Sequence, residues 1–254
     1  MTGIREKIAG RPWLVFWAIL ALLSLGTAGL EIVRLDVRFA LMIDDLRIHG
    51  LGLFPTMRGM PYGDYPSGFM LPAWLTTLGG RYVTLWTLTL PGLILGAGIV
   101  TLVMRIGENA APGAGIAAAG MMLLTPELLN IFMSFGLDVP VAAAGVLLLY
   151  LWQRKIAPWL AISSFMLLLV FCFACRGPMG LLLLGAAAGG FLLAERRWKA
   201  VLIAGTTGLA TLLATGWLWR LLVHCQGGET LWQTFLDCQI GDRMAGSDYC
   251  YYFY

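Results

Sequence analysis

Charge is scarce in this sequence. Only 12% of the 254 residues are charged, whereas 59% are hydrophobic and the mean hydropathy is +0.80. A soluble domain of this length could bury a core but could not hide so much apolar surface. The composition therefore excludes an ordinary soluble domain and indicates an integral membrane protein.

Histidine and clustered basic residues are scarce as well. The only histidines, His49 and His224, are far apart in the sequence and give little support to a histidine-based metal site. No basic cluster with interleaved aromatic residues lies away from the membrane-flanking positions, so nucleic acid is not expected as a partner. From the residues alone we assign no metal ligands.

Cysteine is sparse, with five residues. Cys172 and Cys175 lie inside an apolar run and are expected to be small packed residues of a helix, because zinc would need two more ligands nearby. Cys225, Cys238 and Cys250 follow the last apolar run and allow one disulfide in an oxidising compartment, with the pairing left open.

Long apolar runs dominate what is present. A membrane span needs roughly 20 apolar residues. We expect an all-α membrane helix bundle with about seven spans, in which Pro91 and Pro126 kink the second and third. The expected spans are 13–33, 82–104, 112–134, 138–153, 157–174, 178–194 and 199–222. Residues 1–222 are then one transmembrane domain with an outer loop at 35–80.

The basic residues set the expected orientation. Because Lys and Arg favour the cytoplasmic side, the N-terminus is expected in the cytoplasm. The inner side then holds nine of the 17 Lys and Arg residues but only three of the 14 acidic residues. The inner basic residues are Arg5, Lys7, Arg11, Arg105, Arg154, Lys155, Arg196, Arg197 and Lys199. We expect the inner (plasma) membrane, with the active site on the periplasmic face.

The segment from Asp36 to Trp74 is polar and punctuated by proline between two apolar runs. It predicts two amphipathic interfacial helices at the membrane surface, where enzymes acting on lipid-linked substrates place their chemistry. Asp36 could accept a proton from an acceptor hydroxyl, with Arg38 two residues on. A plainer interpretation is that these charges, with Asp44 and Asp45, solvate an interfacial helix.

More charges are expected on the same face. Asp138 opens the fourth span and is expected either as a helix N-cap or as a site carboxylate. Arg176, in the turn between the fifth and sixth spans, could hold a phosphate by paired hydrogen bonds. Arg58, Arg81 and Arg243 join this face, which suits an anionic lipid headgroup.

Four motifs in register carry a resemblance. They are D-V-R-F-A at 36–40, P-x-x-x-G-x-P-Y at 55–62 followed by D-Y-P-S at 64–67, G-L-D-V-P at 136–140, and R-G-P-M-G at 176–180. Together with residues 243–254 they resemble C-type (GT-C) glycosyltransferases. The nearest branch is the group of bacterial aminoarabinose transferases and protein O-mannosyltransferase-like enzymes.

The resemblance implies transfer of a sugar from a polyprenyl-phosphate carrier to a lipid, glycan or protein acceptor. Asp36 matches the family's catalytic-loop aspartate, and Arg176 matches its phosphate-contacting lysine. Asp138 matches its second loop carboxylate. Tyr62 and Tyr65, within the motifs, are expected to bind substrate along with Arg38, Arg58, Arg81 and Arg243. A divalent metal occurs in this superfamily, but the sequence does not assign one.

Departures from the family pattern indicate a divergent subgroup. Val37 stands where the family has glutamate, Tyr65 where it has lysine, and Arg176 where it has lysine. The family also continues with more spans and an outer domain. Residues 223–254 are therefore expected either to dock on the membrane surface or to lead into further sequence.

Three hypotheses for the function follow. The first is a polyprenyl-phosphate-dependent glycosyltransferase or its N-terminal portion. The second is a transporter or flippase of lipid-linked substrates, although no internal repeat is visible and the polar residues gather at one face. The third is an inactive remnant of the family that packs against a partner.

Overall fold

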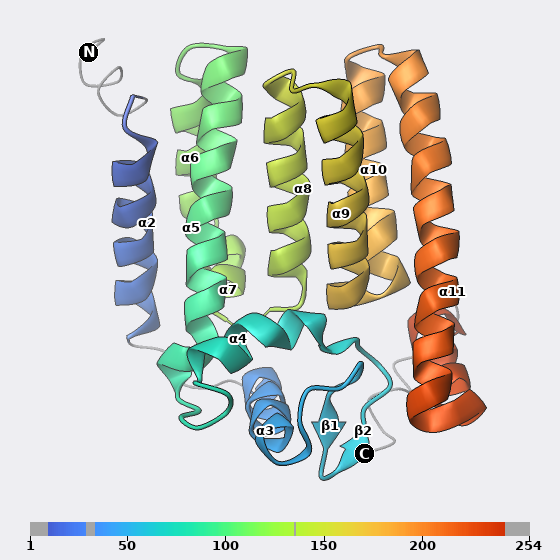
Figure 1. Cartoon of the computed structure of the whole chain (residues 1–254). Coiled ribbons are helices and arrows are strands. Elements are labelled where there is room, and N and C mark those ends of the chain that lie inside the picture. Colours follow the sequence, from blue (N-terminus) through green and yellow to red (C-terminus); the bar gives the residue numbers. More distant parts are fainter. Residues whose placement is uncertain (1–9, 29–33, 135, 242–254) are drawn as a thin grey trace.

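The computed structural model describes residues 10–28, 34–134 and 136–241, except for the side chains of residues 34–36, 227, 239 and 240. Within these ranges the regular structure is helical apart from one hairpin of two two-residue strands, and loops and turns connect the elements. The helices alternate in direction, and they stand side by side as a bundle (Figure 1). The elements are α2 Pro12–Thr27, α3 Arg34–His49, β1 Thr56–Met57, β2 Met60–Pro61, η1 Ser67–Met70, α4 Leu71–Thr76, α5 Leu85–Ala110, α6 Ala114–Leu123, α7 Pro126–Met133, α8 Asp138–Gln153, α9 Pro158–Arg176, α10 Pro178–Ala194, α11 Trp198–Leu236 and η2 Asp237–Gly241.

Proline and threonine mark where several helices begin. Pro12, Pro126, Pro158 and Pro178 occupy the first turns of their helices, where a missing N–H costs nothing. Helix α5 instead begins with a capping box, in which Thr84 and Thr87 exchange side-chain and backbone hydrogen bonds. Local sequence signals thus determine where these helices begin, and the residues that follow are mostly apolar.

Each expected span overlaps a helix or a helix pair, although residues 29–33 of the first expected span lie outside the described residues. By length and composition, α5, α9 and residues Trp198–Gln226 of α11 are able to cross a membrane. The pair α6 and α7 qualifies as a fourth span, bent by 73° at the break before Pro126, as the sequence predicts. Helices α2, α8 and α10 are apolar but shorter, with 16 or 17 residues. The structure therefore supports three or four spans, and the count of seven stays a prediction.

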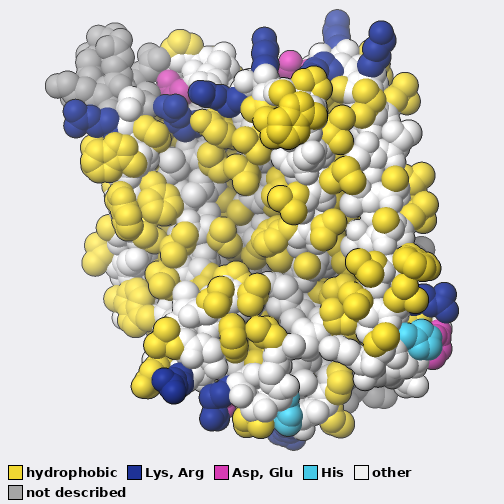
Figure 2. Space-filling model, viewed as in Figure 1, with side chains coloured by type: hydrophobic (Ala, Val, Ile, Leu, Met, Phe, Trp, Pro, Cys, Tyr) yellow, Lys and Arg dark blue, Asp and Glu magenta, His cyan; other side chains and the backbone are white. Residues whose placement is uncertain are grey.

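The outer surface of the bundle suits a lipid environment. Figure 2 shows a broad hydrophobic band between ends that carry the Lys and Arg side chains. Exposed tryptophans lie near both edges of this band, a position that the amphipathic indole ring favours. On α11, exposed Trp198 and Trp217 are separated by about 28 Å of helix, close to the hydrocarbon thickness of about 30 Å.

The loop after α2 lies across one end of the bundle. Helices α3 and α4 run across the lower end in Figure 1, as expected for interfacial helices. The loop packs closely on α9, because a Cβ on Gly68 would come within 2.7 Å of the carbonyl carbon of Ala174. Phe54 from the loop also packs on Trp219 and Phe235 of α11. The loop is therefore packed against the bundle, and its side chains are held in place against α9 and α11.

Candidate functional site

Three parts of the chain converge at the end of the bundle that carries the first loop: α3, the segment between β2 and η1, and the facing ends of α8 and α9 (Figure 1). Together they hold a set of charged and aromatic side chains that contact one another. We call this set the loop–bundle cluster. Its members are Arg38, Tyr62, Asp64, Tyr65, Asp138 and Arg176.

Arg176 links α8 with α9. Its Nε lies 2.9 Å from Oδ1 of Asp138, in an ion pair between the last residue of α9 and the first residue of α8. The arginine side chain is 19% exposed and the aspartate side chain 64% exposed. Asp138 is therefore not a helix N-cap, since Leu137 takes that position, and the carboxylate is directed to Arg176 instead.

A strained glycine keeps Arg176 at the turn. Gly177 has φ 63° and ψ −150°, a conformation essentially restricted to glycine, and it joins α9 directly to α10. A side chain at position 177 would oppose this conformation.

Two tyrosine rings connect the arginines. The guanidinium carbon of Arg176 lies 5.2 Å from the ring centroid of Tyr65, and that of Arg38 lies 5.7 Å from the ring centroid of Tyr62. The two rings are 6.2 Å apart, and both tyrosines are buried. Arg38 Nη1 also donates a hydrogen bond of 3.3 Å to the Tyr62 hydroxyl. Each guanidinium is thus held against an aromatic face.

Asp64 is a member that the sequence reasoning did not single out. It is only 4% exposed, and the Tyr62 hydroxyl donates a 3.3 Å hydrogen bond to its Oδ2. Burial of a carboxylate costs free energy unless the carboxylate is hydrogen-bonded. The hydrogen bond from Tyr62 offsets that cost and links Asp64 to the cluster. The available signal was its position in the D-Y-P-S motif, but burial depends on how the loop packs against the helices.

Nη1 of Arg176 and Oγ of Ser67 are buried polar atoms of this region with no hydrogen-bond partner among the described residues. Unsatisfied buried donors cost free energy and are uncommon in native proteins. A guanidinium nitrogen of this kind can donate to an oxygen of a bound anion. The cluster therefore combines positive charge with unused donor capacity.

Other expected site residues lie apart or outside the description. Arg58 and Arg81 are exposed and belong to none of the contacts that define the cluster. Asp36 lies on α3 two residues before Arg38, but its side chain is outside the described residues, as is all of Arg243. Among the expected site residues, the structure thus brings together Arg38, Tyr62, Tyr65, Asp138 and Arg176.

The acidic residues of α3 have local roles. Asp44 lies 3.2 Å from the Nε of Arg47, and both side chains are about half exposed. Asp45 accepts a hydrogen bond from the backbone N–H of Gly59 and thereby holds the β1–β2 turn to the helix. Both carboxylates therefore have partners on α3 or in the adjoining hairpin.

The end of α11 carries a second polar group. Glu229 Oε2 lies 2.8 Å from Nε2 of His224 and 3.9 Å from Arg220, and Oε1 accepts a hydrogen bond from Gln233. The pKa of this exposed carboxyl is lowered, mainly by the hydrogen bond from Gln233. The hydrogen bond with His224 and the positive charge of Arg220 lower the pKa further. Cys238 beyond it is disulfide-bonded, whereas Cys225 is free.

Metal ligation finds no support in the described ranges. There, no group of three or more His, Cys, Asp or Glu side chains is placed to hold a metal ion. Asp64 and Asp138 belong to one cluster but are engaged by Tyr62 and Arg176. The chemistry available from the described side chains is anion binding by arginine together with carboxylates that can accept protons.

Comparisons with models of known protein families, with curated proteins and with solved structures find no match.

Proposed function

We propose that this chain is an integral membrane glycosyltransferase. It moves a sugar from a polyprenyl-phosphate carrier to a lipid, glycan or protein acceptor at the end of the bundle that carries the loop–bundle cluster. The observation that carries the proposal is the state of Arg176. Its guanidinium is paired with Asp138, stacked on Tyr65 and left with a buried Nη1 that has no described partner.

A phosphate fits that arrangement for physical reasons. Arginine presents several N–H donors in a planar fork that matches phosphate geometry, and buried charge-assisted hydrogen bonds are strong. Arg38, held on the neighbouring tyrosine, adds a second positive charge. The N-terminus of α10 begins beside Arg176 at Pro178 and favours negative charge as well.

The proposed reaction is an inverting displacement. The acceptor oxygen attacks the anomeric carbon, and the bond between that carbon and the phosphate oxygen breaks. Asp36 takes the proton of an acceptor hydroxyl, whereas a phosphate acceptor is already anionic and needs positioning alone. Arg176 and Arg38 stabilise the negative charge that develops on the departing polyprenyl phosphate.

The proposed topology places the N-terminus in the cytoplasm and the cluster on the periplasmic side of the inner membrane. Two observations support this orientation. The turns at the opposite end hold Arg154, Lys155, Arg196 and Arg197, as the preference of basic residues for the cytoplasm requires. The disulfide at Cys238 fits an oxidising compartment.

Sugar transfer tests the function directly. Membranes containing the chain are supplied with radiolabelled polyprenyl-phosphate sugars, and label in an acceptor fraction is measured. Asp36→Asn is compared with Asp44→Asn, a matched removal of a carboxylate from the same helix. We expect transfer by the wild type and by Asp44→Asn, and loss of transfer in Asp36→Asn at equal expression.

The outcomes separate the competing functions. Transfer that survives Asp36→Asn would overturn the role of that aspartate while leaving a transferase. Movement of labelled lipid across vesicles without transfer would support a flippase. Failure of the wild type with every donor would support a non-catalytic protein.

A further inference from the structure

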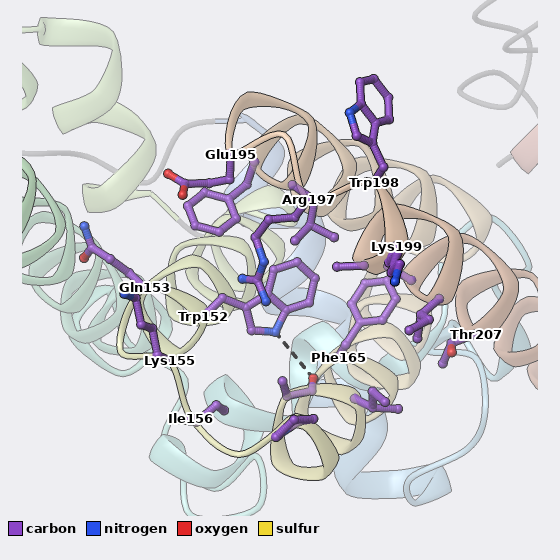
Figure 3. A pocket seen from close by; sticks show the side chains of 18 of the residues that line it. Trp152, Gln153, Lys155, Ile156, Phe165, Glu195, Arg197, Trp198, Lys199 and Thr207 are labelled. Atoms are coloured by element: carbon purple, nitrogen blue, oxygen red, sulfur yellow. Dashed lines mark hydrogen bonds between the residues drawn. The ribbon is translucent and has the colours of Figure 1, made fainter.

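A large pocket lies at the end of the bundle opposite to the loop–bundle cluster. Its volume is about 1060 Å³, and it is formed by α8, α9, α10 and α11 with the turns that join them (Figure 3). No step of the proposed transfer uses it. Its position coincides with the end at which the basic turns lie.

The mouth of the pocket is positively charged. Four cations line it, Lys155, Arg196, Arg197 and Lys199, against a single carboxylate, Glu195. All five residues are exposed at this end. In Figure 3 the side chain of Arg197 points into the pocket toward Trp152. An anionic group at the mouth is therefore strongly preferred to a cationic one.

Backbone conformation places two of these cations. Lys155 and Arg196 directly follow the C-caps of α8 and α10 in the left-handed region, with φ of 51° and 54°. Glycine usually takes such a position at a helix end. Cations here also complement the partial negative charge of the helix C-termini, while the nearby N-termini of α9 and α11 favour an anion.

The interior of the pocket is apolar and groove-shaped. Along α9 it is lined from Pro158 to Phe165, and along α11 from Trp198 to Thr207, so it reaches about 10 Å from the turns. Small residues leave this space between the helices, namely Ala161, Ala200 and Ala204. The groove is therefore able to take an aliphatic chain.

One wall of the groove is a rigid aromatic group. The ring of Trp152 contacts that of Phe165 at 5.7 Å and that of Phe191 at 6.3 Å. Its Nε1 donates a 3.4 Å hydrogen bond to the carbonyl of Ala161, which satisfies the indole without a ligand. No described polar group of this wall requires water.

Helix α11 leaves the groove accessible from the lipid. Only 6% of an 18-residue apolar stretch of α11 is buried within the protein, whereas 61% of the corresponding stretch of α5 is buried. A lipid molecule is thus able to enter sideways. A soluble anion would gain from the charged mouth but would leave the apolar groove unfilled.

We infer that this pocket binds one anionic phospholipid. The headgroup phosphate lies among Lys155, Arg196, Arg197 and Lys199, and an acyl chain lies in the groove between α9 and α11. Under the proposed topology this end faces the cytoplasmic leaflet, whose anionic lipids are attracted to such basic sites. The inference concerns binding alone and does not depend on the transferase reaction.

Lipid titration of the purified full chain tests this inference. Bound lipid is counted by native mass spectrometry in neutral detergent, with phosphatidylglycerol compared with phosphatidylcholine of the same acyl chains. We expect one phosphatidylglycerol per chain to be bound more tightly than phosphatidylcholine. Each basic residue near an anionic headgroup is worth roughly fivefold in affinity, so R197Q/K199Q should weaken binding roughly 25-fold.

Two control variants keep the result specific. R11Q/R154Q removes the same number of cations at the same end of the bundle but outside the pocket lining, and it should retain wild-type affinity. Ala204→Leu fills the groove without changing charge and should also weaken binding. Thermal unfolding confirms that each variant is folded.

Three results would overturn the inference. The first is equal affinity of the two double variants for phosphatidylglycerol. The second is unchanged binding by Ala204→Leu. The third is displacement of the lipid by equimolar glycerol 3-phosphate, which would mean that the site binds soluble anions and that the groove plays no part.

Discussion

Replacing Arg176 tests the central feature of the proposed site. The structure gives this arginine two protein contacts, the Nε–Asp138 ion pair and the stack on Tyr65, and leaves its buried Nη1 for another acceptor. Arg176→Ala removes all three, whereas Arg176→Lys keeps the charge but loses the planar fork. The two variants therefore separate the charge from the geometry.

The expected magnitude follows from these contacts. A hydrogen bond to a charged group is worth about 1.5–3 kcal/mol, which corresponds to roughly a 10- to 150-fold loss of kcat/KM in Arg176→Ala. Arg176→Lys should lose about tenfold. The stability cost should be smaller, because Asp138 is 64% exposed and an ion pair with water access is worth at most about 1 kcal/mol.

The assay is sugar transfer by the purified chain, run together with thermal unfolding. Arg47→Lys is the matched control, since Arg47 is a half-exposed arginine that pairs with Asp44 and is not among the expected site residues. Wild-type kcat/KM in Arg176→Lys would refute the use of paired donors. Loss of activity in Arg176→Ala that only tracks the unfolded fraction would reduce Arg176 to a structural partner of Asp138.

Three further predictions concern packing, topology and pH. Gly68→Ala should lower the unfolding temperature, at a cost of about 1–3 kcal/mol, because the new methyl group meets the backbone of α9; an unchanged temperature would contradict the packing. A membrane-impermeant maleimide should label Cys225 from the periplasmic side of intact cells, and Cys238 only after reduction; labelling of Cys225 only in inverted vesicles would reverse the topology. The hydrogen bond from Gln233 lowers the pKa of Glu229 in the folded protein. The ionised carboxylate therefore contributes its full stabilisation of the fold above the ordinary carboxyl pKa, and this contribution is lost as the pH falls through the lowered pKa. Gln233→Ala should raise that pKa in an NMR titration, and an unchanged value would refute the cause given.

The helices and their directions could be predicted from local signals. Apolar runs fix where helices form, and Pro126, Pro158 and Pro178 mark their starts. Because the connections are short, neighbouring helices run antiparallel. The alternation then places Asp138 and Arg176 at the same end as the first loop, as the sequence predicts.

Side-chain partners could not be predicted in the same way. Asp138 fits a helix N-cap by sequence, yet its carboxylate is directed to Arg176, which is distant in the chain. The burial of Asp64 depends on the docking of the loop against α9. Such contacts arise from packing between segments that are distant in the sequence, whereas periodicity and capping rules describe only neighbouring residues.

The pocket at the opposite end was missed for a related reason. In the sequence, the basic residues Lys155, Arg196 and Arg197 indicate only the cytoplasmic side. That role needs no precise geometry, whereas a pocket exists only if α9 and α11 stand far enough apart. Small residues on membrane helices indicate close approach in general. Only the structure shows that the alanines line an open groove.

The two ends of the bundle favour anions through the same physics, but with different strength per residue. At each end a basic residue at or just past a helix C-terminus adjoins the N-terminus of the next helix, as Arg176 does before α10 and Arg196 before α11. Helix dipoles favour this placement of cation and anion at both turns. Arg176 is largely buried, so its charge is weakly screened, whereas the cations of the pocket mouth are exposed and screened by salt. The proposed phosphate site therefore needs few contacts, whereas the proposed lipid site needs several cations and an apolar groove.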